Sequence, residues 1–232
     1  MKTHALLTVL MFLLMSFKTD RPNLNNSRLL PPLKSYANTL IKDFDGIDAD
    51  RKKSLKKLAI YIESKLNANE SAKLTFICTH NSRRSQMSQV WAQSAAEYYG
   101  INGVEAYSGG TEATAFNPRA VKALQKAGFK IIKTKEGSNP IYEVTYAEGK
   151  SIKGYSKKYT DENNPQKDFC AVMTCSHADK NCPMVLGASL RVAIPYEDPK
   201  AFDGNTNEEA NYDERCRQIA TEIFFAFSLI RK

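Results

Sequence analysis

The chain has 232 residues, 42% hydrophobic and 10% aromatic, which is enough apolar content for a packed globular core. Its net charge of +8 comes from lysines on helices and loops, such as Lys52, Lys53, Lys56, Lys157 and Lys158. Without a zinc-finger or RNA-binding motif, this charge predicts solvated lysine faces and attraction for anionic substrates, and no nucleic-acid partner. The five cysteines are odd in number and widely spaced, which argues against a secreted disulfide framework.

An apolar stretch, residues 5–17, follows Lys2 at the start of the chain. It is shorter than the roughly 20 residues that span a bilayer, but it has the length of a signal-peptide core. No A-x-A cleavage site follows, and translation from Met15 would remove the signal altogether. For the possible signal-like segment 1–17, export or tethering and a cytoplasmic product therefore both stay open.

Residues 18–72 are predicted to form a linker and a helical extension. Residues 18–33 are polar and contain prolines, whereas 34–46 and 50–68 are predicted helices. The second helix has one apolar face, made by Leu55, Leu58, Ala59, Ile62 and Leu66. We expect this helical pair to pack on the main domain, and it carries no recognisable chemistry.

Residues 73–232 are predicted to form an α/β domain. Strands are expected at 73–78, 104–110, 129–133, 168–175 and 189–196, and helices at 83–99, 117–126 and 208–230. This alternation predicts a three-layer, doubly wound parallel sheet with helices on both faces. Asn117 and Pro118 are a typical helix start, and Gly128 a typical stop.

Residues 138–167 interrupt this alternation. "IYEVTY" alternates in polarity, "AEGK" is a turn signal and "SIKGYSKKY" follows, which predicts an inserted β-hairpin and loop. The insert could serve as a partner surface or as a lid, and the sequence does not distinguish the two.

The segment "CTHNSRRS" places Cys78 at the end of a buried strand and Arg84 and Ser85 at the start of a helix. A thiol attacks as the thiolate, which backbone N–H groups and a helix N-terminus favour. Arg84 offers a fork that binds an oxyanion through two N–H groups, and Ser85 can donate to the sulfur. The C-x5-R-S spacing between strand and helix therefore predicts a nucleophile beneath a bound oxyanion.

"FICTHNSRRSQMSQVW" resembles the phosphate-binding loop of low-molecular-weight protein tyrosine phosphatases, and more closely that of the thioredoxin-coupled arsenate reductases sharing their fold. The resemblance covers residues 73–232, including "AYSGGTEATAFNPRAVKALQKAGFKI". It implies that Asn81 shapes the loop and that Ser108 contacts Asn81. His80 and Arg83 depart from the usual glycine and cysteine. The implied oxyanion-binding loop comprises Cys78, Thr79, His80, Asn81, Ser82, Arg83 and Arg84.

"CSHADKNCP" places Cys175 after a strand and Cys182 seven residues later. This spacing allows a disulfide if the segment can unfold, although structural cysteines or zinc ligation with His80 or His177 are alternatives. The segment resembles the redox segment of the thioredoxin-coupled arsenate reductases. That resemblance implies a relay in which Cys78 attacks arsenate, Cys175 attacks the adduct and Cys182 resolves the disulfide.

"YEDPKAFDG" places Asp198 before a proline and just beyond a strand. The resemblance implies that Asp198 is the general acid for the leaving oxygen, because the family has an Asp-Pro loop there. "KAF" follows in place of the tyrosines of the phosphatases, although Phe202 could still offer a ring. Some reductases hold a potassium ion near the loop, but Gln89 stands at the carboxylate position, so no metal and no cofactor are implied.

The sequence thus predicts an enzyme that reduces arsenate to arsenite, with thioredoxin as its reductant. The alternative is a phosphatase that hydrolyses phosphomonoesters through a cysteinyl-phosphate at Cys78, with Cys175 and Cys182 as a redox switch or relic. A non-catalytic oxyanion-binding module is a third possibility, which the intact C-x5-R-S motif argues against. Because the relay needs reduced thiols, we expect a cytoplasmic protein.

Overall fold

A computed structural model describes residues 27–181 and 184–231. The signal-like segment 1–17 and Cys182 lie outside the described residues. Within the described ranges, no helix combines the length and apolarity needed to cross a bilayer.

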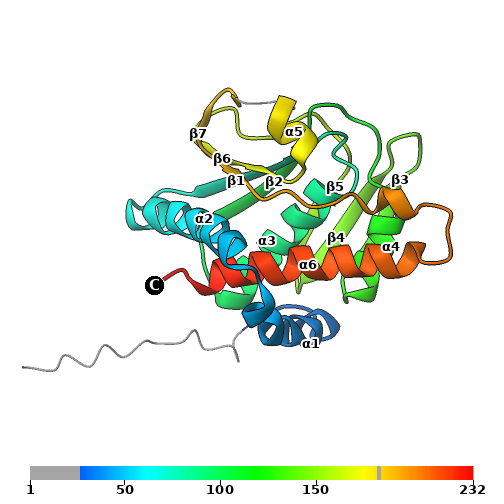
Figure 1. The fold of residues 1–232 in the computed structure, drawn as a ribbon, viewed down its shortest axis with the longest axis horizontal. Helices are drawn as coiled ribbons and strands as arrows, with labels where there is room; N and C mark the ends of the chain where they lie inside the picture. The colour runs from blue at the N-terminus through cyan, green and yellow to red at the C-terminus, as the bar shows by residue number, and fades with distance from the viewer. Residues whose placement is uncertain (1–26, 182–183, 232) are drawn as a thin grey trace, which may run out of the picture.

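The centre of the structure is a four-stranded parallel sheet with the order β2-β1-β6-β7 (Figure 1). Its strands are β1 (Ala72–Cys78), β2 (Val104–Gly110), β6 (Phe169–Met173) and β7 (Ala188–Ala193). Every residue of β6 and all but one of β1 are buried, as expected for parallel strands covered on both faces. The predicted α/β class with a parallel sheet is confirmed.

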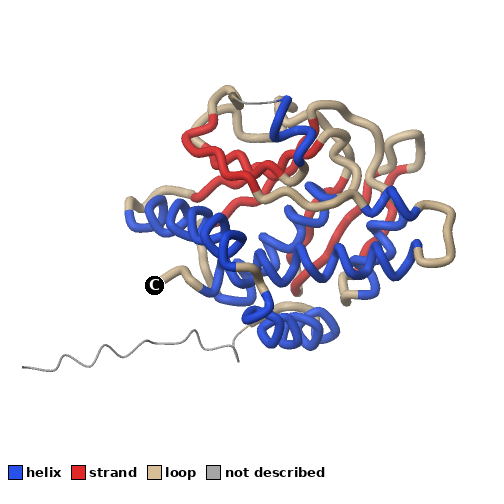
Figure 2. Tube along the Cα trace, in the orientation of Figure 1, coloured by secondary structure: helices blue, strands red, loops and turns tan. Residues whose placement is uncertain are grey.

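The two faces of this sheet are covered unequally (Figure 2). On one face, the long helices α2 (Ala49–Asn67) and α3 (Arg84–Tyr99) contact the strands, and α6 (Glu208–Ser228) packs on both of these helices. The other face packs against the short helix α5 (Ser176–Asn181) and loop segments. The alternation along β1 divides the core accordingly, because Phe76 joins the cluster under the long helices and Ile77 the cluster that includes Ala178 of α5.

A second sheet has three antiparallel strands, β3 (Lys130–Lys135), β4 (Ile141–Ala147) and β5 (Lys150–Gly154). The strand predicted at 129–133 therefore does not belong to the parallel sheet, and that expectation is wrong. Its sequence, KIIKTK, explains the difference, because a strand buried on both faces needs a longer apolar run and β3 is mostly exposed. β4 and β5 form an antiparallel pair joined by the predicted turn.

The helices of the N-terminal extension are α1 (Pro31–Leu40), the 3-10 helix η2 (Ile41–Gly46) and α2. Asp48 caps α2 by accepting hydrogen bonds from the backbone N–H groups of Asp50 and Arg51. Leu33, Leu40, Leu55, Leu58 and Ile62 are all fully buried in the main core. The extension is thus part of the hydrophobic core and brings α2 against β1, β7 and α6.

The remaining elements are α4 (Pro118–Lys126) and the 3-10 helix η3 (Pro199–Phe202). The Asn117 side chain accepts a hydrogen bond from the Arg119 N–H, so the predicted cap of α4 is confirmed. The Asn117 N–H also donates to the Ser82 carbonyl at 2.9 Å, which fixes the start of α4 against the Cys78 loop.

Candidate active site

Cys78 ends β1 and α3 begins at Arg84, so the residues between them form a loop at the carboxyl edge of the parallel sheet. The Cys78 Sγ lies 3.1 Å from the Ser85 Oγ. Asn81 Nδ2 donates to the same Ser85 oxygen at 2.8 Å. Since Ser85 accepts from Asn81, its hydroxyl proton is free to donate to the Cys78 sulfur. The loop therefore provides the hydrogen bond to sulfur that the sequence predicts.

Asn81 gives the loop its shape. Its backbone has a φ of 45°, in the left-handed region that asparagine tolerates better than most residues. Its Oδ1 accepts hydrogen bonds from the Lys157 N–H at 2.9 Å and from Gln86 Nε2 at 3.2 Å. The Asn81 side chain therefore bonds to Ser85, Gln86 and Lys157 at once, and these bonds hold the loop backbone in one conformation.

Ser108 does not make the contact with Asn81 that the resemblance implies. Its hydroxyl donates instead to Gln89 Oε1 at 2.6 Å, and Gln89 Nε2 donates to the Ala106 carbonyl. The loop is approached by Gly110 at the end of β2, where an added Cβ would lie 2.6 Å from the Thr79 carbonyl oxygen. Ser108 thus ties α3 to β2, and a glycine permits the close approach of β2 to the loop.

The segment that follows β5 supports the loop from outside. The Ser156 hydroxyl donates to the His80 carbonyl at 2.8 Å, and Gln86 Nε2 donates to the Tyr155 carbonyl at 2.7 Å. Lys157, which is predicted to lie on a solvated surface, is only 6% exposed. Burial lowers the pKa of the Lys157 ammonium to about 8. Part of the predicted insert is therefore a structural support for the loop.

Arg84 connects the loop to the Asp-Pro segment. Its Nη2 donates to Asp198 Oδ2 at 2.6 Å, and its Nη1 donates to the Tyr196 carbonyl at 3.0 Å. Asp198 also caps η3 by accepting from the Lys200 N–H. The Arg84 Nε is buried and has no hydrogen-bond partner among the described residues. The Nε–H group of Arg84 is thus available to donate to a bound oxyanion. Arg84 would then donate to the oxyanion and to the Asp198 carboxylate at the same time.

The Arg83 side chain is engaged outside the loop. Its Nε donates to the Tyr212 hydroxyl of α6 at 2.7 Å, and its Nη2 lies 3.4 Å from Asp203 Oδ2. The Tyr212 hydroxyl in turn donates to Asp203 Oδ1 at 2.7 Å. The Arg83 guanidinium, at a position where the resemblance implies a cysteine, therefore joins the loop to α6 and to the segment after η3.

Cys175, which follows β6, lies against the same loop. Its Sγ is 3.6 Å from the Thr79 Oγ1 and accepts a hydrogen bond from the Ala178 N–H at 3.3 Å. The Thr79 hydroxyl is also 3.2 Å from His177 Nδ1. Cys78 and Cys175 belong to one buried cluster. The structure therefore brings together two of the three predicted relay thiols, while Cys182 lies outside the described residues.

Cys170 and Cys216 are core residues. Burial raises the pKa of each thiol to about 12, and Trp91 Nε1 donates to the Cys216 sulfur at 3.3 Å. Both side chains thus remain protonated and unreactive through neutral pH.

We expect iodoacetamide to distinguish these cysteines at pH 7. Cys78 should be alkylated, and arsenate or phosphate should slow its reaction by occupying the loop. Cys170 and Cys216 should react only after denaturation, because each lies in the main core, away from the loop, with a thiol pKa of about 12. Peptide mapping by mass spectrometry measures each site separately. Alkylation of Cys78 that oxyanions leave unchanged would exclude Cys78 from the oxyanion site.

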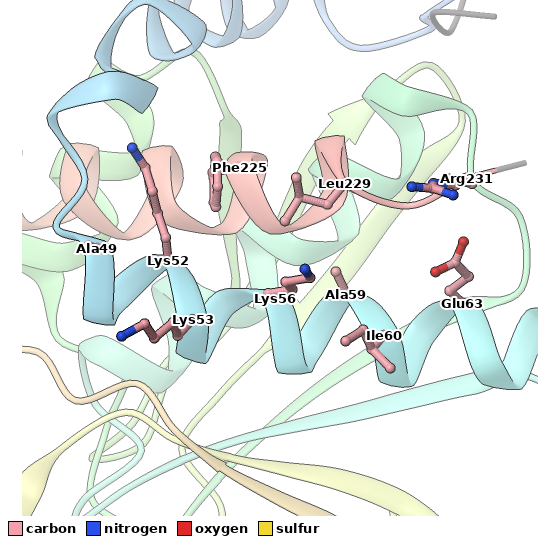
Figure 3. A pocket seen from close by; sticks show the side chains of 10 residues that line it. All are labelled: Ala49, Lys52, Lys53, Lys56, Ala59, Ile60, Glu63, Phe225, Leu229 and Arg231. Carbon is pink, nitrogen blue, oxygen red and sulfur yellow. The ribbon is translucent and has the colours of Figure 1, made fainter. Parts of the chain in front are cut away.

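A surface groove of about 390 Å³ lies away from the loop, between α2 and the end of α6 (Figure 3). Its lining combines the lysines of α2, among them Lys53 and Lys56, with the exposed side chains of Ile60 and Leu229. Lys53 forms an ion pair with Asp50 at 2.8 Å. These lysines form the solvated face that the composition predicts.

Comparison with known proteins identifies the family. The sequence model described as "Low molecular weight phosphotyrosine protein phosphatase" matches residues 73–140. "Arsenate reductase 2" of Staphylococcus epidermidis is 31% identical over 126 residues, which are 53% of this chain and 76% of the relative. The arsenate reductase of Halalkalibacterium halodurans is 31% identical over 142 residues, 61% of this chain and 84% of the relative.

A solved low-molecular-weight phosphotyrosine phosphatase from Vibrio cholerae has 13% identity and a TM-score of 0.46, and the match covers 67% of this chain and 94% of that one. The sequence relatives decide the assignment. The chain belongs to the family of low-molecular-weight phosphotyrosine protein phosphatases and arsenate reductases.

Proposed function

We propose that this protein reduces arsenate to arsenite through a relay of Cys78, Cys175 and Cys182. The observation that carries the proposal is the contact of the Cys175 sulfur with Thr79, which puts a second thiol beside the anion loop. Hydrolysis of a phosphomonoester requires no second thiol, whereas reduction of arsenate takes two electrons that thiols supply by forming a disulfide. Curated relatives named arsenate reductase support the same assignment.

In the first step, the Cys78 thiolate attacks arsenic and an oxygen leaves as water. Arg84 and the loop N–H groups stabilise the oxyanion, and Ser85 holds the sulfur through its hydroxyl. Asp198, hydrogen-bonded to Arg84, is within reach of the same anion and gives the leaving oxygen its proton.

In the second step, the Cys175 thiolate attacks the Cys78 sulfur of the adduct. A Cys78–Cys175 disulfide forms, the arsenic–sulfur bond breaks and its electron pair stays on arsenic, which leaves as arsenite. Cys182 then attacks Cys175, which releases the Cys78 thiolate and leaves a Cys175–Cys182 disulfide. Thioredoxin reduces that disulfide and restores the enzyme.

Because this cycle starts from reduced thiols, we propose a cytoplasmic location in place of export or tethering through residues 1–17. N-terminal sequencing of the native protein after cell fractionation tests this. A mature chain that begins near residue 17 in an oxidising compartment would contradict it.

Hydrolysis of phosphomonoesters is the second candidate function. The arrangement of Cys78, Arg84 and Asp198 favours it, since these groups suffice to form and hydrolyse a cysteinyl-phosphate. The discriminating experiment assays one preparation for thioredoxin-dependent arsenite release and for hydrolysis of aryl phosphates and phosphotyrosine. Arsenite release that depends on both arsenate and thioredoxin supports the reductase, and hydrolysis alone supports the phosphatase.

Asp198→Asn is expected to lower kcat by about 10²- to 10⁴-fold, because the amide cannot protonate the leaving oxygen. Inhibition by phosphate should become tighter, because a neutral amide no longer competes for Arg84. Steady-state kinetics with added phosphate measures both effects. Glu197→Gln is the matched control, since the exposed Glu197 is the adjacent acid. An unchanged kcat in Asp198→Asn would remove Asp198 as the acid.

A further inference from the structure

The segment that leaves β7 carries two of the groups that contact the candidate active site. The Tyr196 carbonyl accepts from Arg84 Nη1 at 3.0 Å, and Asp198 accepts from Arg84 Nη2 two residues later. The segment continues the pairing of the parallel sheet through two hydrogen bonds, from the Ile194 N–H to the Met173 carbonyl and from the Tyr196 N–H to the Thr174 carbonyl. The position of this backbone therefore sets the position of the Arg84 guanidinium.

Arg51, in the first turn of α2, contacts this backbone from the N-terminal extension. Its Nη2 donates to the Pro195 carbonyl, one residue before Tyr196. Its guanidinium also lies over the Tyr196 ring, with 5.0 Å between the Cζ and the ring centroid. Both contacts join residues that are about 144 positions apart in the chain.

Glu222 of α6 fixes the Arg51 guanidinium. The Arg51 Nε lies 3.1 Å from Glu222 Oε2, and the two side chains are only 19% and 6% exposed. Gln218 Nε2 donates to the other Glu222 oxygen at 3.2 Å. Burial raises the pKa of Glu222, and the Arg51 charge opposes that rise. A buried carboxylate needs such a partner, so Arg51 is held in a single arrangement.

The Tyr196 side chain lies beside Arg51 and connects it to the backbone that Arg84 contacts. This side chain is buried, and burial followed by the Glu222 charge raises the pKa of the phenol well above its ordinary value. The hydroxyl therefore stays protonated. Residue 196 is thus held at its carbonyl by Arg84 and at its ring by Arg51, which Glu222 fixes in turn.

We propose that Arg51 is a positioning residue for the active site, which acts by fixing the Pro195–Tyr196 backbone and, through it, Arg84 and Asp198. The inference rests on the roles that the proposed function gives to Arg84 and Asp198. It assigns a catalytic contribution to the helical extension, because Arg51 lies outside residues 73–140, which match the family model. Arg51 touches neither the oxyanion nor the reacting sulfur.

The test compares Arg51→Met with the double variant Arg51→Met/Glu222→Gln. The double variant removes the unpaired buried carboxylate that the single variant would leave, so it separates the positioning effect from loss of stability. We expect kcat for arsenate reduction to fall about 10- to 100-fold in the double variant, since displacements of about 1 Å cost up to about 10²-fold. Arg51→Lys should recover part of this loss, because an ammonium can still donate to the Pro195 carbonyl.

Arg217→Met is the matched control. Arg217 also joins the extension to α6, through an ion pair with Asp43 at 2.5 Å, and it stacks over Tyr36 at 5.6 Å. None of these contacts involves residues 194–198. Arg217→Met should therefore keep the wild-type kcat even if it lowers the melting temperature.

A second readout does not depend on turnover. Phosphate protection of Cys78 against iodoacetamide reports oxyanion affinity alone, and the double variant should need severalfold more phosphate for half protection. A folded double variant with wild-type kcat and wild-type protection would overturn the proposal, as would an equal loss in Arg217→Met. If the wild type reduces no arsenate, the proposed function fails, whereas the protection comparison still decides the role of Arg51.

Discussion

Cys78→Ser is expected to abolish thioredoxin-dependent arsenite release, a loss on the order of 10⁴-fold or more. The serine hydroxyl remains protonated where the thiol gives a thiolate, and the neighbouring Ser85 cannot replace a missing sulfur nucleophile. Hydrolysis of any phosphomonoester should be lost together with the reduction, because both reactions begin at this atom. The measurement is arsenite formed per enzyme over several turnovers.

Cys216→Ala is the control for Cys78→Ser. Cys216 is as deeply buried as Cys78, but its sulfur contacts Trp91 in the core and no residue of the loop. The control should lose some stability and keep its kcat. Residual reduction by Cys78→Ser above about 1% of wild type would show that another thiol attacks arsenate, which the proposed relay forbids.

Cys175→Ser and Cys182→Ser are expected to abolish steady-state arsenate reduction by stopping it at different stages. Without Cys175, no second thiol attacks the adduct at Cys78, so arsenite is not released. Without Cys182, each enzyme releases one arsenite, and turnover then stops because the enzyme remains in the form with a Cys78–Cys175 disulfide. The contact of Cys175 with Thr79 beside the loop motivates the first of these expectations.

Both relay variants should keep whatever phosphomonoester hydrolysis the wild type shows, because that chemistry uses only Cys78, Arg84 and Asp198. Arsenite release and aryl-phosphate hydrolysis, measured on the same preparations, separate the two effects. Undiminished arsenite release in both variants would mean that the pair is structural, and the phosphatase would then be the better assignment.

Much of the candidate site was predictable because it is local in sequence. Cys78, Asn81, Arg84 and Ser85 lie within eight consecutive residues between a buried strand and a helix, and the structure contains that loop. The parallel sheet followed from long apolar runs alternating with helices. A short run such as KIIKTK carries no comparable signal, so the pattern does not show that β3 pairs with β4 in a separate antiparallel sheet.

Contacts between distant parts of the chain were not predictable from the pattern. Arg83 meets Tyr212 and Arg51 meets Pro195 across 129 and 144 positions. No sequence motif marks Tyr212 or Pro195 as a partner. The directions of the Arg51 and Tyr212 side chains depend on how α2 and α6 pack together. The contact implied for Ser108 is absent for the same reason, since its hydroxyl donates to Gln89 on α3.

The most direct test of the relay is to add arsenate once to reduced Cys182→Ser and map its disulfides by mass spectrometry. The proposed relay predicts one Cys78–Cys175 disulfide and one arsenite per enzyme, neither of which forms without arsenate. Recovery of both cysteines as free thiols, with continued arsenite release, would contradict it.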